Sequence, residues 1–75
     1  MNVTVVLFGA LRGKAGRSEL RLDLPAGATV AQAIAASGLE DRVDLWVLVD
    51  GERAGRERLL AEGAQLTFFQ PVGGG

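Results

Sequence analysis

Two segments in distant parts of the sequence, 3–9 and 64–69, restrict the possible folds of this chain more than any other feature. Both are rich in β-branched and aromatic residues, which is typical of β-strands. The first, VTVVLFG, is largely apolar on both faces, as expected for a central strand that is covered on each side. In the second, AQLTFF, Leu66 and Phe68 share one face and Thr67 and Phe69 the other. We expect the two strands to lie side by side at the centre of a sheet and to run parallel.

The sequence between them predicts further strands. Segment 18–24, SELRLDL, alternates apolar and charged residues, which indicates a half-buried strand paired antiparallel with the first one. Segment 45–50, LWVLVD, predicts another strand, and the DG at 50–51 predicts a tight hairpin turn. Segment 10–17 is expected to form a loop or a short irregular helix. After the hairpin turn, we expect Leu59 and Leu60 to attach a short turn of helix to the core.

One amphipathic helix is predicted after Pro25. Thr29 is a suitable N-cap, and Gln32 three residues later completes a capping-box pattern. An apolar stripe with helical spacing follows, and Gly38 is suited to end the helix in a left-handed conformation. The residues of this stripe are Val30, Ala33, Ile34 and Ser37.

This order of elements predicts an α+β fold with a mixed sheet of four to five strands and one main helix. The arrangement with parallel first and last strands is the β-grasp, or ubiquitin-like roll. The 75 residues are expected to form one domain over 1–70, followed by a flexible C-terminal Gly-Gly tail at 71–75.

The composition excludes several kinds of active site. Without cysteine or histidine, the chain has no thiolate nucleophile, no imidazole base and neither of the metal ligands that these residues provide, and we expect no metal site. The formal net charge of −1 does not favour nucleic-acid binding. The N-terminal segment lacks the pattern of a signal peptide and no apolar run could cross a membrane, so we expect a cytoplasmic protein.

The last three residues are glycines. They come soon after the predicted strand at 64–69, and Pro71 and Val72 lie just before them. Ordering glycine is costly, on the order of 1–2 kcal/mol per residue for the backbone. Glycine, however, allows backbone to pass close to backbone and leaves the terminal carbonyl open to a nucleophile. A carboxylate is a poor electrophile, so a reactive end would require activation, for instance as an acyl-adenylate made from ATP.

The chain resembles the sulfur-carrier family, which includes the small subunit of molybdopterin synthase and the thiamine-pathway sulfur carrier. The matching segments are LFGALRGKAG at 7–16, LPAGATVAQAI at 24–34, VLVDGE at 47–52 and LLAEGAQLTFFQPVGGG at 59–75. The last is the most specific, because the synthase small subunit typically reads aromatic-aromatic-Pro-Pro-Val-x-Gly-Gly. The residues that fit are Phe68, Phe69, Pro71, Val72, Gly74 and Gly75. Gln70 replaces the first proline, and Gly73 occupies the variable position.

The resemblance implies a carrier with no bound cofactor, which donates sulfur while its partners catalyse. An E1-like enzyme would use ATP to adenylate the carboxylate of Gly75, and a sulfur donor would convert it to a thiocarboxylate. The tail would then enter the large subunit of molybdopterin synthase and supply sulfur to a pterin precursor. Pro71, Val72, Gly73 and Gly74 would form the inserted segment.

The resemblance also implies a docking surface at Phe8, Phe69 and Arg12. Residue chemistry leaves alternatives open, because both phenylalanines could belong to the core and Arg12 could be a solvated surface residue. The function has alternatives too. These are sulfur carriage for thiamine, tRNA thiolation or cysteine synthesis, a ubiquitin-like modifier conjugated through Gly75, and a plain β-grasp interaction or RNA-binding module.

Overall fold

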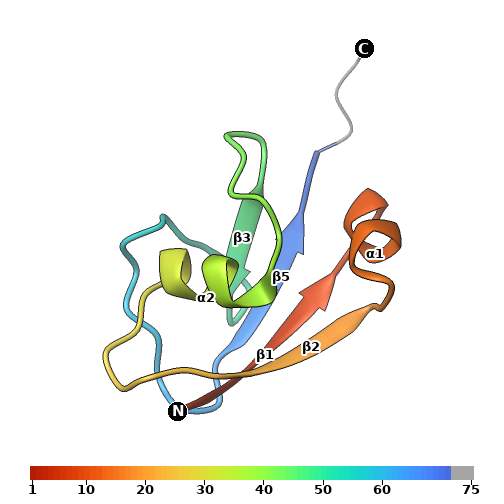
Figure 1. Ribbon diagram of the computed structural model, residues 1–75. Coiled ribbons are helices and arrows are strands. Elements are labelled where there is room, and N and C mark those ends of the chain that lie inside the picture. The colour runs from red at the N-terminus through yellow and green to blue at the C-terminus, as the bar shows by residue number, and fades with distance from the viewer. Residues whose placement is uncertain (72–75) are drawn as a thin grey trace.

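The computed structural model describes residues 1–71, which form a five-stranded sheet and two helices (Figure 1). The elements are β1 (Asn2–Leu7), α1 (Ala10–Ala15), β2 (Glu19–Asp23), α2 (Val30–Ser37), β3 (Trp46–Val49), β4 (Glu52–Arg53) and β5 (Gln65–Phe69). Their order across the sheet is β2-β1-β5-β3-β4. The predicted tail residues Val72, Gly73, Gly74 and Gly75 lie outside the described residues.

The predicted pairing of the first and last strands is confirmed. β1 and β5 are parallel neighbours in the middle of the sheet, with Leu7 opposite Phe68. β2 pairs antiparallel with β1, and β3 pairs antiparallel with both β4 and β5. This mixed sheet with α2 across it is the β-grasp fold that the sequence predicts.

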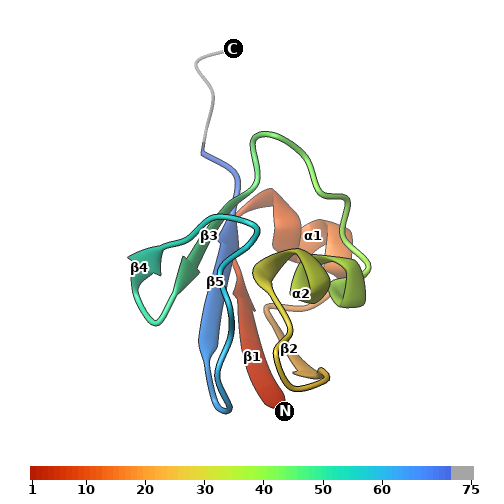
Figure 2. The ribbon, with the colours of Figure 1, turned by 90° about the vertical axis from the view of Figure 1, so that its left-hand side faces the viewer.

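The prediction that β1 is covered on both sides is wrong. α2 lies over one face of the sheet, while the opposite face has no covering helix within residues 1–71 (Figure 2). On the covered face Val3, Val5 and Leu7 are buried, whereas Thr4 and Val6 on the other face remain partly exposed. The apolar residues of the second face therefore contribute to a surface and not to a second core.

The core lies between the sheet and the helices. Its members are Val3, Val5, Leu7, Leu11, Leu24, Ala28, Val30, Ala33, Ile34, Leu45, Val47, Val49, Leu60, Ala64, Leu66 and Phe68. Every one of them is apolar, and no side-chain nitrogen or oxygen atom is buried without a partner in the described chain. A core of this kind stabilises the fold but offers no interior chemistry.

The local signals around α2 are confirmed. The backbone N–H of Gln32 donates to Thr29 Oγ1 at 3.4 Å, and the N–H of Thr29 donates to Gln32 Oε1 at 2.9 Å, which completes the capping box. Gly38 ends the helix with a φ of 79°. The hairpin turn is confirmed as well, because Asp50 and Gly51 both have positive φ, as a type I′ turn requires.

The short helical turn expected at Leu59 and Leu60 is absent. Leu60 is buried as expected, but Leu59 is 66% exposed and its segment is extended. The N–H of Val30 donates to the carbonyl of Arg58 at 3.0 Å, and the N–H of Leu60 donates to the carbonyl of Ala28 at 2.9 Å. These pairings with the start of α2 satisfy the backbone of the segment in place of a helix.

Candidate functional site

The parallel pairing of β1 and β5 brings their carboxyl ends to the same edge of the sheet. Phe8 follows β1 directly, and its N–H donates to the carbonyl of Phe68 at 3.1 Å. Phe69 ends β5, and Gln70 and Pro71 continue from it away from the sheet (Figure 1). The base of the predicted tail therefore lies beside Phe8, a residue from the other end of the sequence.

An apolar groove of about 440 Å³ lies at this place. It is lined by Phe8, Gly9, Leu48, Thr67, Phe69, Gln70 and Pro71. Phe8 is 52% exposed, and Phe69 and Leu48 are partly exposed. The core alternative for Phe8 is thus excluded, and the two predicted aromatic docking residues line one groove. Contiguous exposed apolar surface marks many interaction sites.

Leu48 belongs to this groove but was not predicted to do so. It lies in β3, opposite Thr67 of β5, and its side chain is on the uncovered face of the sheet. The alternation of LWVLVD separates Leu48 from the core residues Val47 and Val49, yet alternation alone does not show which face is left uncovered.

The aromatic surface continues from the groove onto the β3–β4 hairpin. The rings of Trp46 and Phe69 are 5.8 Å apart between centroids and tilted by 53°. The guanidinium carbon of Arg53 lies 3.7 Å from the centroid of the Trp46 ring, which is a cation–π contact. In the sequence, Arg53 belongs to a stretch of mixed charges that is typical of a solvated loop. The sequence signal for its contact with Trp46 was the position of Arg53 opposite Leu48 in the predicted hairpin.

Arg12 is exposed on α1 and is not among the residues that line the groove. Its side chain takes part in no ion pair within residues 1–71. Its backbone N–H donates to the carbonyl of Gly9, and its carbonyl accepts from Gly16. The structure thus leaves the guanidinium available to a partner but does not join Arg12 to Phe8 and Phe69, so its docking role remains a prediction.

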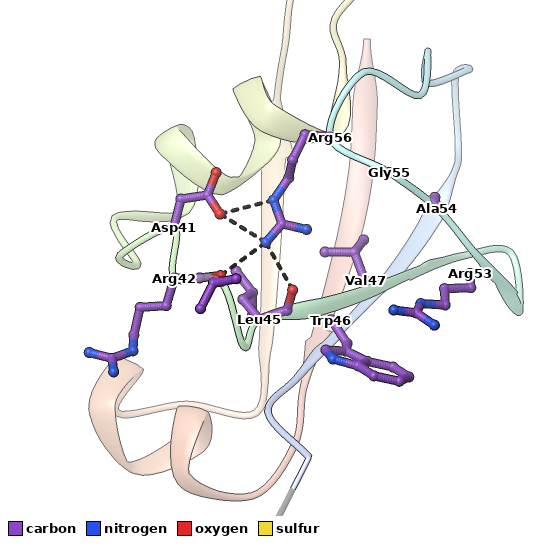
Figure 3. Close-up of a pocket in the computed structure, with 10 residues that line it drawn as sticks. Asp41, Arg42, Leu45, Trp46, Val47, Arg53, Ala54, Gly55 and Arg56 are labelled. Carbon is purple, nitrogen blue, oxygen red and sulfur yellow. Dashed lines mark hydrogen bonds and ion pairs between the residues drawn. The ribbon is translucent and has the colours of Figure 1, made fainter. Parts of the chain in front are cut away.

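A second hollow, of about 720 Å³, lies between the loop before β3 and the segment after β4 (Figure 3). Arg56 crosses one side of it. Its Nε and Nη2 atoms lie 2.9 Å from a carboxylate oxygen of Asp41, and Nη2 also donates to the carbonyls of Arg42 at 3.1 Å and Leu45 at 2.9 Å. Sequence reasoning missed this role of Arg56, because two of its four contacts are to backbone carbonyls.

Neither a metal centre nor a membrane span is found in the described part of the chain. Among residues 1–71, no three His, Cys, Asp or Glu side chains are grouped so that they could hold a metal ion. Over the same range, neither helix has the length and apolar character required to cross a bilayer.

Comparison with known proteins places the chain among small ubiquitin-like proteins. The sequence model of the ThiS family matches residues 5–75. A search of curated protein sequences returned no match. Among solved structures, SAMP1 from Haloferax volcanii is similar at 29% identity and a TM-score of 0.88, with 100% of each chain covered.

Two further solved structures are similar over nearly their whole length. A Pyrococcus furiosus protein provisionally assigned as molybdopterin converting factor subunit 1 is 26% identical, with 96% of this chain and 99% of that one covered and a TM-score of 0.84. Urm1 from Trypanosoma brucei is 18% identical, with coverages of 99% and 95% and a TM-score of 0.71, and it supports the fold alone.

Proposed function

Because the chain belongs to the ThiS family of ubiquitin-like sulfur carriers, we propose that it carries sulfur as a thiocarboxylate on Gly75. The observation that supports this most directly is the extent of the family match, which runs through residue 75 and so includes the terminal glycines. The groove beside Pro71 adds physical support, since it provides a docking surface next to the base of the tail.

The proposed chemistry begins with activation of the carboxylate by an E1-like partner. A carboxylate oxygen of Gly75 attacks the α-phosphorus of ATP, and pyrophosphate leaves as the acyl-adenylate forms. A hydrosulfide equivalent from a sulfur donor then attacks the carbonyl carbon, and AMP leaves with the bonding electron pair. The product is a thiocarboxylate. ATP is bound by the partner, and this cycle operates in the cytoplasm, where ATP and the partners are available.

The proposed docking surface consists of Phe8, Leu48 and Phe69, with Arg12 at a separate position on α1. A partner that covers the groove would hold the base of the tail while Pro71, Val72, Gly73 and Gly74 enter its active site. Large aromatic side chains dominate the energetics of interfaces, so the two phenylalanines are the expected anchors.

We further propose molybdopterin synthesis as the pathway, with this chain as the sulfur-donating small subunit and the large subunit as the catalyst. The FFQPVGGG end of the sequence and the similarity to the Pyrococcus furiosus protein support this assignment. Thiamine synthesis, tRNA thiolation and cysteine synthesis use the same first two steps and differ in the sulfur acceptor.

The similarity to SAMP1, whose name describes a small archaeal modifier protein, favours protein conjugation as a second candidate. In that function an amine nitrogen, and not sulfide, attacks the adenylated carbonyl and an amide forms. Lys14 is the only lysine of the chain and is exposed on α1. Lys14→Arg therefore removes the only internal lysine acceptor and separates self-conjugation from conjugation to other proteins.

Intact-mass spectrometry tests both candidates. The chain is incubated with ATP, sulfide and the activating enzyme of its own organism, and the carrier function predicts a mass increase equal to the difference between sulfur and oxygen. The chain lacking Gly75 is the control, and it should keep its melting temperature but not be charged. A wild-type mass that never changes would overturn the carrier proposal. Conjugates of higher mass without thiocarboxylate would favour the modifier.

A further inference from the structure

Two contacts join the base of the tail to the residues just before and at the start of β3. The side-chain amide of Gln70 donates from Nε2 to Asp44 Oδ1 at 3.2 Å. One residue earlier, the ring of Phe69 packs on Trp46. Gln70 is the first residue after β5, so its direction is not set by the hydrogen bonds of the sheet. The bond to Asp44 is therefore a constraint on where the chain goes after the sheet ends.

Asp44 is itself held in place. The same Oδ1 atom accepts a hydrogen bond from Arg42 Nε at 3.3 Å, and the N–H of Leu45 donates to the carbonyl of Arg42 at 3.0 Å. Asp44 thus lies within a hydrogen-bonded turn whose two ends are Arg42 and Leu45. A carboxylate in a fixed turn loses less conformational entropy when it binds Gln70 than one on a mobile loop.

Arg56 fixes this turn from outside. Its Nη2 atom donates to the carbonyls of both Arg42 and Leu45, and its guanidinium pairs with Asp41 (Figure 3). The Arg56 side chain is 32% exposed, so these bonds are partly shielded from water. The planar fork of arginine can reach a carboxylate and two carbonyls together, which the ammonium of lysine does less well.

Gln70 stands where the related motif has a proline, so the two residues can be compared in how they restrain the chain. The motif of the synthase small subunit has proline at this position. Proline stiffens the chain because its ring fixes φ, and it has no N–H to donate. Glutamine has no such stiffness. In this chain, the hydrogen bond to Asp44 supplies a restraint at the position where the ring is missing.

We propose that Asp44 and Gln70 form a polar latch that directs the base of the tail, and that Arg56 is a positioning residue for this latch. The inference rests on the proposed function, in which the tail must enter the active site of a partner. When the Gln70 side chain is bound to Asp44, the chain can leave the sheet in fewer directions. Less conformational entropy is then lost when the tail enters the active site of the partner. The latch should therefore lower the KM for the carrier in adenylation and leave kcat unchanged.

The existence of the latch can be tested without any partner. In ¹⁵N-labelled protein, Asp44→Ala should shift the side-chain amide signals of Gln70 and speed their hydrogen exchange. Glu40→Ala is the matched control, because Glu40 Oε2 lies 3.8 Å from Arg42 Nη1 in the same loop but does not contact Gln70. Arg56→Lys should shift the same Gln70 signals in the direction of Asp44→Ala. Equal spectra at Gln70 for Asp44→Ala and Glu40→Ala would overturn the latch.

The effect of the latch is tested by steady-state adenylation with the activating enzyme. Asp44→Ala should raise the KM for the carrier by up to about two- to tenfold, the factor that corresponds to the net contribution of one typical hydrogen bond, with kcat unchanged. Adding Gln70→Pro to Asp44→Ala should restore much of the lost affinity, because the ring replaces the bond. An unchanged KM would overturn the directing role even if the Gln70 signals move. If wild-type protein is not adenylated at all, the proposed function fails, and the spectra still decide whether the latch exists.

Discussion

Phe8 and Phe68 have the same side chain and are joined by a backbone hydrogen bond, yet their truncation should have very different costs. Phe68 is fully buried between the sheet and the helices. Phe68→Ala should therefore lower the free energy of unfolding by about 3–5 kcal/mol, since it removes a buried ring and leaves a cavity. The whole chain should be stable by only about 4–11 kcal/mol, from its length and the usual stability per residue.

Phe8→Ala should cost far less, because Phe8 is 52% exposed. Complete burial of a phenylalanine contributes about 1.5–3 kcal/mol, so a half-exposed ring contributes roughly 1 kcal/mol. The difference between the two variants is then about 2–4 kcal/mol. With a urea m-value near 1 kcal/mol/M for a chain of this size, the unfolding midpoints should differ by about 2–4 M.

The assay is urea unfolding followed by far-UV circular dichroism and by the fluorescence of Trp46, the only tryptophan. Phe8→Asp should unfold close to Phe8→Ala but bind the activating enzyme more weakly than the wild type. If Phe8→Ala shifts the midpoint as much as Phe68→Ala, the ring is part of the core and the groove is not a surface. If Phe8→Asp binds like the wild type, Phe8 is exposed but does not dock.

Three further predictions concern the fold and the aromatic surface. Thr29→Ala removes the acceptor for the N–H of Gln32, and the free energy of unfolding in urea should fall by about 1 kcal/mol, whereas Thr29→Ser should keep most of it. Gly51→Ala should lower the free energy of unfolding by about 1–2 kcal/mol, because φ is 87° at this position. An added Cβ meets no atom within 4 Å, so backbone strain is the only cost, and a neutral result would contradict the type I′ turn. Arg53→Ala should shift the emission of Trp46 and lower stability by about 0.5–1 kcal/mol, while an unchanged emission spectrum would argue against the cation–π contact.

The parts of the fold that were predicted depend on short-range patterns. The capping residues Thr29 and Gln32 act within one helical turn, and Asp50 and Gly51 adopt a turn that their own backbone preferences favour. The central pairing of the first and last strands of the sequence was inferred from their apolar character. Each of these features can be recognised without knowledge of distant contacts.

The parts that were missed depend on partners far away in the sequence. Leu59 is exposed because its segment pairs with the start of α2, and nothing in its neighbouring residues indicates that pairing. Arg56 alternates with acidic residues, as solvated arginines do, but it binds carbonyls, which every residue has. A hydrogen bond to a backbone carbonyl therefore cannot be recognised from the pattern of side chains in the sequence.

Of the residues at the candidate site, Phe8 and Phe69 were predicted, whereas Leu48, Trp46 and the contact between Gln70 and Asp44 were not. The placement of Phe8 and Phe69 in one groove follows from strand ends that meet at one edge of the sheet. The contact between Gln70 and Asp44 could not be predicted, since it joins a position that departs from the family motif to a loop that has no motif.

The position of β5 between β1 and β3 also determines when the groove can form. β5 comes last among the described strands, yet it occupies the interior of the sheet, so β1 and β3 lack their common neighbour until it has been synthesised. Pairing of segments so distant in sequence is a slow step of folding. The groove needs residues from all three regions, so an incompletely folded chain lacks it. Under the proposed function, a partner that binds the groove before it modifies Gly75 would select correctly folded copies without a separate quality-control step.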